Sequence, residues 1–143
     1  MYLSDLLFSQ GFGTRRICAG LVQKGLVKID TGTGLQLMDE DQDTTPTEGM
    51  PYEVQGVSWQ FHTKAYILLH KPAGTECSHK PSVWPSVYSL LPAPLRYRPA
   101  KTGLQGVQAV GRLDQDTTGM LLLSDDGQFI HRMSSPKHHV PKL

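Results

Sequence analysis

The segment from Gly111 to Gly127 constrains this chain more than any other part of its sequence. It reads Gly-Arg-Leu-Asp-Gln-Asp-Thr-Thr-Gly, then Met-Leu-Leu-Leu-Ser, then Asp-Asp-Gly. The apolar run predicts a buried strand, the Asp-Asp-Gly predicts a tight turn, and the residues before the run predict a loop with two carboxylates. Asp114 therefore lies where a loop enters a rigid strand, and the side chains of a functional site need such support.

A shorter pattern lies upstream of this segment. Residues 65–70 are apolar and β-prone, and the Lys-Pro-Ala-Gly of 71–74 ends them with a predicted turn. Residues 79–108 follow as a stretch punctuated by Pro and Gly, with a short helix predicted at 87–91. The basic residues within 96–101 either contact RNA or form an ordinary basic loop, and the sequence leaves both interpretations open.

The start of the chain predicts a short helix that ends at a glycine-rich break. Leu3, Leu6 and Leu7 have helical spacing, and Ser4 is placed to cap the start of the helix. The Gly-Phe-Gly of 11–13 ends it.

A second helix is predicted over 15–24. Thr14 stands at its N-cap position, and Gly25 follows it in the position where helices commonly finish with glycine. Its apolar stripe consists of Ile17, Cys18, Leu21 and Val22. This stripe gives the helix one face to bury.

The helices lead into short predicted strands and an acidic loop. The strands cover 27–29, 35–37 and 52–54. The acidic stretch 39–48 is predicted to be a surface loop before the last of them. A linker near 56–63 then separates a first domain, residues 1–57, from a second domain, residues 64–143.

The charge distribution says more than the net charge of +1. Residues 1–30 carry a net charge of +2, residues 31–63 carry −6 without any Lys or Arg, and residues 64–143 carry +5. Contact with RNA is therefore expected at the two basic regions and not at the acidic one. A mixed, solvated surface is the alternative interpretation of the same charges.

Composition sets broad limits on the class of protein. With 143 residues, of which 38% are hydrophobic, the chain is long enough for one ordinary globular domain or two small ones. No apolar run approaches the length of a membrane span, and the N-terminus lacks the plan of a secretory signal. The two cysteines do not suggest a disulfide framework, so we expect a cytoplasmic protein.

Two short helices followed by a strand, with Arg15 and Arg16 opening the second helix, resemble the S4 RNA-binding domain. The resemblance implies that Arg15, Arg16 and Lys24 lie on the face that binds RNA phosphates. Guanidinium groups bond phosphate oxygens in pairs and release counterions on binding. Such contacts orient a protein on RNA but carry little sequence information.

Three motifs in the chain closely resemble those of bacterial ribosomal-RNA pseudouridine synthases, of the type that modifies small-subunit rRNA. They are the Gly-Arg-Leu-Asp of 111–114, the Leu-x-Lys-Pro-x-Gly of 69–74 with Cys77-Ser78, and the Ser-Pro-Lys-His-His of 135–139. The resemblance implies an α+β fold, with a small S4-like α/β module before part of a mixed, mostly antiparallel sheet. It implies that Asp114 is the catalytic residue and that Lys71 contacts RNA.

The same resemblance implies ribosomal RNA as the partner, with neither DNA nor a membrane, and it implies no cofactor. The adjacent His138 and His139 lack the helical spacing of a paired metal site, and Cys77 with His79 makes a weak alternative set of ligands. We therefore expect no metal.

The chemistry expected at Asp114 leaves two roles open. Pseudouridine forms when uracil is cut from ribose C1′, turned, and rejoined through carbon, which requires an ionised carboxylate close to C1′. That carboxylate acts either as a nucleophile or as a base on the sugar. Arg112 is expected to support the loop or a phosphate, and Thr117 to make a loop hydrogen bond. Asp116 receives a turn or capping role, because a like charge beside Asp114 would hinder its ionisation.

The end of the chain leaves two functional classes open, an enzyme and a non-catalytic RNA-binding module. In the resembled family a Lys-x-Tyr and a later strand with a basic partner for the Asp follow, and neither occurs before residue 143. We therefore expect a fragment or a naturally shortened product that is inactive, or nearly so, by itself. The alternative is a non-catalytic S4-type RNA-binding module with a partial catalytic domain. An unrelated hydrolase that uses Asp114 and Asp116 as an acid–base pair is a third possibility. Oligomeric state and the modified uridine stay open.

Overall fold

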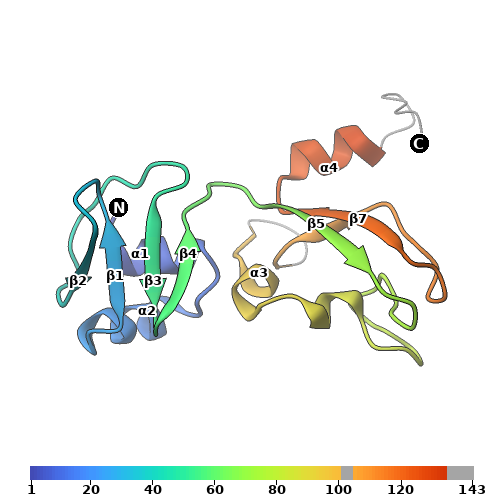
Figure 1. The fold of residues 1–143 in the computed structure, drawn as a ribbon, viewed down its shortest axis with the longest axis horizontal. Coiled ribbons are helices and arrows are strands. Elements are labelled where there is room, and N and C mark those ends of the chain that lie inside the picture. The colour runs from blue at the N-terminus through green and yellow to red at the C-terminus, as the bar shows by residue number, and fades with distance from the viewer. Residues whose placement is uncertain (101–104, 135–143) are drawn as a thin grey trace. The chain divides into compact units, whose positions relative to one another are not determined.

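The computed structural model describes residues 1–100 and 105–134 (Figure 1). These residues form two compact units. The first unit contains Met1–Thr63 together with Tyr97–Pro99, and the second contains Lys64–Arg96 and the residues from Ala100 onward. Helices and antiparallel sheets make up both, so the predicted α+β class is confirmed. None of the described helices is long and apolar enough to cross a membrane.

The first unit packs two helices against a four-stranded antiparallel sheet with the order β2-β1-β3-β4 (Figure 1). Its elements are α1 (Leu3–Ser9), α2 (Arg15–Gln23), β1 (Val27–Asp30), β2 (Leu35–Met38), β3 (Pro51–Val54) and β4 (Val57–Gln60). Val27 lies opposite Val54, and Ile29 lies opposite Tyr52, so these side chains share one face of the sheet. They are buried with the leucines of α1 and with Cys18 and Val22 of α2 in a single core. Burying each such side chain contributes roughly 1.5–3 kcal/mol.

The predicted N-cap residue is found at α2 but not at α1. Thr14 caps α2 as predicted, and its Oγ1 accepts a hydrogen bond of 3.2 Å from the backbone N–H of Ile17. At α1 the prediction was wrong, because Tyr2 occupies the N-cap and Ser4 lies inside the helix. Asp41 of the acidic loop supplies the missing acceptor, at 2.9 Å from Ser4 N and 2.6 Å from Ser4 Oγ. A carboxylate at this place also interacts favourably with the helix dipole.

One member of the predicted apolar stripe of α2 lies outside the core. Cys18 and Val22 are fully buried and Leu21 packs against the core, but Ile17 is 54% exposed. The buried stripe of α2 is therefore narrower than the sequence predicted.

The segment predicted as a linker contains the fourth strand. Val57–Gln60 pairs with Pro51–Val54 through a two-residue turn, Gln55-Gly56. Both turn residues have positive φ, 52° and 82°, as a hairpin turn that matches the twist of the strands requires. Asn-Gly is the usual sequence of such turns and Gln is an uncommon substitute, which is why the hairpin was not predicted. The first unit therefore extends to Thr63 rather than to residue 57.

The second unit contains an antiparallel sheet with the order β5-β7-β6, together with short helices. Its elements are β5 (Tyr66–Lys71), the 3₁₀ helix η1 (Val87–Leu90), α3 (Ala93–Tyr97), β6 (Gln108–Val110), β7 (Gly119–Ser124) and α4 (Gly127–Ser134). The central strand is β7, the strand predicted from the apolar run. Its Leu121 and Leu123 lie opposite Leu69 and Ile67 of β5 and are buried.

One local prediction in the second unit needs correction. The Asp-Asp-Gly predicted as a tight turn instead starts α4, where Asp126 Oδ1 accepts a 3.2 Å hydrogen bond from Phe129 N. Hydrogen bonds from the Tyr66 hydroxyl and from Phe129 N hold the pKa of Asp126 below its usual range. The described strands of this sheet all pair antiparallel, which agrees with the prediction of part of a mostly antiparallel sheet.

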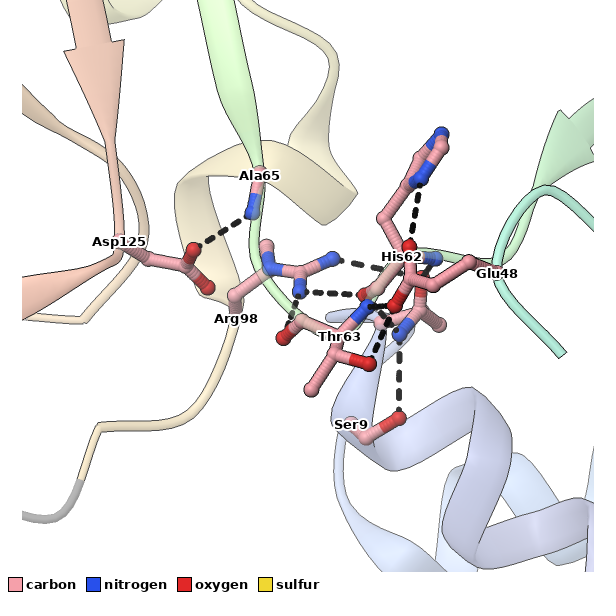
Figure 2. Close-up of polar contacts among 8 residues, drawn as sticks. Ser9, Glu48, His62, Thr63, Ala65, Arg98 and Asp125 are labelled. Atoms are coloured by element: carbon pink, nitrogen blue, oxygen red, sulfur yellow. Dashed lines mark hydrogen bonds and ion pairs between the residues drawn. The ribbon is translucent and has the colours of Figure 1, made fainter. Parts of the chain in front are cut away.

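The basic segment 96–101 contains a buried arginine. Arg98 is only 4% exposed and belongs to the first unit (Figure 2). Its guanidinium donates hydrogen bonds to the carbonyl oxygens of His62 at 2.9 Å and Thr63 at 3.0 Å, and to Gln10 Oε1 at 3.3 Å. Arg98 therefore supports the end of the first unit and does not offer its charge to RNA.

We expect Arg98→Met to destabilise the first unit by about 2–4 kcal/mol, because the carbonyls of His62 and Thr63 and the amide oxygen of Gln10 lose a buried, charged donor. The loss is measured as faster hydrogen exchange of the backbone amides of β1 and β3. Arg16→Met is the matched control, since Arg16 is an exposed arginine of the same unit. Equal exchange in the two variants would contradict the structural role of Arg98.

Candidate active site

The two sequence motifs of the second unit meet at one end of its sheet. β5 ends at Lys71 and β7 begins at Gly119, and these two residues lie opposite each other in the antiparallel ladder. The turn 71–74 that leaves β5 is therefore next to the loop 111–118 that enters β7. The Lys-Pro-Ala-Gly and Gly-Arg-Leu-Asp motifs form one local structure, although the sequence separates them widely.

Lys71 holds this structure together from inside. Its side chain is fully buried, and its Nζ donates hydrogen bonds to the carbonyl oxygens of Thr117 at 2.8 Å, Pro72 at 3.1 Å and Gln115 at 3.4 Å. An ammonium group has three hydrogens to donate, so three carbonyls satisfy it. The prediction that Lys71 contacts RNA is therefore wrong, because no part of its side chain is accessible.

A signal for this role was present in the sequence. Ile67, Leu69 and Lys71 alternate along β5, so their side chains point to the same face of the sheet. The two apolar residues of this set pack against the core. The alternation therefore indicates that Lys71 faces inward. Because lysine is almost never fully buried, its charge favoured the opposite interpretation, an exposed side chain that contacts RNA.

Two backbone hydrogen bonds complete the support of the loop. Gly74 N donates to Gln115 O at 2.6 Å, and Thr117 N donates to Asp114 O at 3.0 Å. Gly74 has φ +85°, a conformation that other residues adopt at a cost. The carbonyl of Gln115 therefore accepts from both Gly74 and Lys71, and the turn from Asp114 to Thr117 is fixed on both sides.

Asp114 differs from its neighbours because its side-chain carboxylate makes no hydrogen bond with the described residues of the chain. Its backbone carbonyl is engaged in the turn, but its side chain is exposed. Among the residues that the structure describes, none donates a hydrogen bond to its carboxylate. The arrangement combines a fixed backbone with a carboxylate that is open to a ligand, which is the combination that chemistry at a defined atom requires.

The other residues predicted around Asp114 have distinct surroundings. Arg112 is exposed, and its Nη2 donates a long hydrogen bond of 3.5 Å to the carbonyl of Cys77. Thr117 supports the loop through its backbone, with its carbonyl bound to Lys71 and its N–H bound to Asp114. Asp116 is exposed on the same turn.

His79, which the sequence offered as a possible metal ligand, makes other interactions in the structure. The ring of His79 stacks on Tyr88 with centroids 3.8 Å apart, and its Nε2 lies 2.6 Å from Gln108 Oε1. Burial raises the pKa of Tyr88, whose hydroxyl accepts a hydrogen bond of 2.9 Å from the N–H of Ala109. Within residues 1–100 and 105–134, no three His, Cys, Asp or Glu side chains gather as a metal site. His138 and His139 lie outside the described residues.

The residues predicted to bind phosphate lie on the first unit. Arg15, Arg16 and Lys24 are all exposed in or next to α2. The guanidinium of Arg15 lies 4.0 Å from the ring centroid of Phe8, and its Nε is 3.3 Å from Asp5 Oδ1. An exposed ion pair of this kind contributes little to stability.

Comparison with known proteins agrees with the motifs. The family described as RNA pseudouridylate synthase matches residues 65–143. An RNA pseudouridine synthase of Bacillus subtilis (strain 168) is 35% identical over 143 residues, which cover 99% of this chain and 55% of that protein. Ribosomal small subunit pseudouridine synthase A of Vibrio cholerae is 34% identical over 129 residues, which cover 90% of this chain and 50% of that protein.

A crystal structure of a pseudouridylate synthase superimposes with a TM-score of 0.43 and 27% sequence identity, covering 97% of this chain and 54% of that chain. The chain spans about half the length of the curated relatives it matches.

We expect Lys71→Met to loosen the loop that holds Asp114 and to cost about 2–4 kcal/mol of stability, because buried carbonyls lose a charged donor. The amide hydrogens of Gly74 and Thr117, which close this loop, should exchange faster with solvent. Lys80→Met removes an exposed lysine of the same unit and should leave both amides protected. Unchanged exchange at Gly74 and Thr117 in Lys71→Met would contradict the role of Lys71.

Proposed function

The chain belongs to the RNA pseudouridylate synthase family, and we propose that it isomerises a uridine of small-subunit ribosomal RNA with Asp114 as the catalytic carboxylate. The exposed carboxylate of Asp114 on a fixed turn is the observation on which this proposal depends. The class of RNA comes from the relatives named small subunit pseudouridine synthase A. Such a substrate places the reaction in the cytoplasm.

The reaction requires a carboxylate positioned close to ribose C1′ and no redox partner. The bond between uracil N1 and ribose C1′ breaks, the base turns, and a bond forms between uracil C5 and C1′. The proton that C5 loses balances the one that N1 gains, so no redox partner is required. Asp114 takes part either by attacking C1′ or by removing a proton from the ribose.

The geometry of the turn suits a flipped substrate. A uridine within folded RNA is stacked, so it has to leave the stack before a carboxylate can reach C1′. Asp114 is exposed and does not have to break a hydrogen bond with a described residue of the chain to receive it. Arg112, two residues away and also exposed, is placed to bond a phosphate of the flipped nucleotide.

For the first unit we propose an S4-type role in holding the RNA. The exposed Arg16 and Lys24 of this unit, with Arg15 after release from Asp5, bind phosphates. A second candidate function follows from the same residues, because this unit does not contain Asp114. The chain could bind RNA through the first unit without performing catalysis.

Incubation with unmodified small-subunit rRNA, followed by chemical mapping of pseudouridine, tests the catalytic proposal. We expect the chain by itself to form little pseudouridine, as its sequence predicts, and we expect Asp114→Asn to abolish whatever product the native chain forms at a defined position, because the amide is neither a nucleophile nor a base. Asp39→Asn, which removes an exposed carboxylate of the first unit, is the control and should retain activity. Binding of the RNA without any product would favour the second candidate function.

Salt dependence of RNA binding tests the role of the first unit. We expect the double variant Arg16→Ala with Lys24→Ala to weaken binding at all RNA sequences and to reduce the slope of log K against log salt by about 1.4–1.8, one phosphate contact for each residue. Lys28→Ala is the matched control, since Lys28 lies on the face of the sheet opposite the buried Val27 and Ile29. An equal change of slope in the control would show that α2 is not the binding surface.

A further inference from the structure

A pocket lies directly beside the turn that holds Asp114. It has a volume of about 340 Å³ and is lined by Ala73, Gly74, Trp84, Gln115 and Asp116. Its residues come from both motifs of the active site and from the loop before η1. None of the functions assigned above uses Trp84, a residue that is 45% exposed. Its aromatic ring lines a pocket beside the candidate active site, where it is available to stack on a ligand.

The loop that contains Trp84 is held in place by one carboxylate. Glu76 accepts hydrogen bonds from Ser82 N and Ser82 Oγ, both at 3.0 Å, and from Trp84 N at 3.4 Å. Its backbone also bonds on either side, to Pro85 O at 2.9 Å and from Val87 N at 2.8 Å. Hydrogen bonds from the Ser82 backbone lower the pKa of Glu76, so these contacts persist at every pH above that lowered value. The tryptophan is therefore placed before any ligand arrives.

The indole ring of Trp84 lies next to Gly74, whose φ of +85° is the feature that favours glycine at this position. A Cβ on Gly74 would lie 3.8 Å from Trp84 Cε3 and 3.9 Å from Cζ3. The ring thus rests against the same residue that donates to the carbonyl of Gln115. One hydrogen-bonded assembly positions both the aromatic ring and the turn of Asp114.

The lining of the pocket is almost entirely apolar, so it suits a planar, uncharged group, and the exposed Asp116 is the one lining residue with a charged side chain. An aromatic ring binds a nucleobase by stacking, whatever the base. The carboxylate of Asp116 repels a phosphate but accepts a hydrogen bond from an exocyclic amino group, as carboxylates do from cytosine. Uracil offers a carboxylate only its N3–H, whereas an amino group offers two hydrogens, so the pocket favours an amino-bearing base over the target uridine.

We propose that this pocket binds the amino-bearing base of a nucleotide next to the target uridine, with Trp84 as its stacking platform and Asp116 as its edge contact. The proposal rests on the proposed function for the identity of the RNA. Asp116 follows Asp114 by two residues, a span of at most about 7 Å. That distance corresponds to one or two nucleotide steps, so the pocketed base flanks the uridine. Trp84 and Asp116 then read the local sequence, whereas the phosphate contacts of the first unit do not.

Fluorescence of a chain with a single tryptophan tests the pocket directly. Trp59→Phe leaves Trp84 as the only tryptophan, and the substitution keeps an aromatic ring against Phe12. The probes are oligocytidylate, oligouridylate and an abasic ribose-phosphate oligomer of equal length. We expect oligocytidylate to quench Trp84 and to bind more tightly than oligouridylate, and the abasic oligomer to leave the emission unchanged.

Variants then identify the residues involved. In the full native background, measured by anisotropy of labelled oligocytidylate, Trp84→Ala should weaken binding by roughly 5- to 100-fold, and Trp84→Phe should restore most of it. Asp116→Asn should reduce the preference for oligocytidylate over oligouridylate. Val83→Ala is the matched control, because Val83 is the 83% exposed neighbour in the same loop and does not line the pocket. Equal affinity of Trp84→Ala and Val83→Ala would overturn the proposal, as would quenching by the abasic oligomer.

The outcomes separate this inference from the proposed function. If rRNA is modified and Asp114→Asn abolishes product, but Trp84→Ala leaves KM and oligonucleotide affinity unchanged, the pocket proposal fails and the catalytic proposal stands. If oligocytidylate quenches Trp84 but no chain forms pseudouridine, the pocket proposal stands and the catalytic one fails. With both correct, Trp84→Ala raises KM for rRNA more than it lowers kcat.

Discussion

The buried ammonium of Lys71 is the interaction on which the site depends. A charge inside a protein is tolerated only when hydrogen bonds replace its water, and here three carbonyl oxygens do so. Two of these carbonyls belong to the loop of Asp114, so the requirement to satisfy the charge also dictates the path of that loop. Because Lys71 ends β5 opposite the start of β7, the sheet register sets where the ammonium lies. The position of the exposed carboxylate thus follows from a constraint in the interior.

Hydrophobic periodicity predicted most of the fold, because it reports which face of each element is buried. The strands at 27–29, 35–37, 52–54 and 65–70 and the helix after Thr14 all occur close to their predicted bounds. Two of the misses have different causes. Asp41, which is distant in sequence, took the capping role expected of Ser4. The hairpin of Val57–Gln60 is local, but its Gln-Gly turn lacks the usual sequence of such turns.

The candidate site could also be predicted only in part from the sequence. The motif around Asp114 predicted the carboxylate, since its residues are contiguous. The environment of each charge was less accessible to sequence. Lys71, which was expected to contact RNA, is buried in the second unit, and Arg98, whose role the sequence left open, is buried in the first. The stacking surface of Trp84 gave no sequence signal at all, because a lone tryptophan in a proline-rich stretch looks like an ordinary loop residue. Its place beside Asp116 depends on Glu76, whose contacts fold the loop back.

The placement of charge implies a division of labour in recognising RNA. The turn that presents Asp114 also presents Asp116, and two carboxylates close together oppose the approach of a phosphate. Lys71 does not offset them toward solvent, because its hydrogens are all directed at carbonyls of the chain. Under the proposed function, the RNA strand therefore has to meet this turn with its bases rather than its backbone, except near the exposed Arg112. The phosphates are then left to the basic surface of α2, which makes sequence-independent binding a property of the first unit and base selection a property of the second.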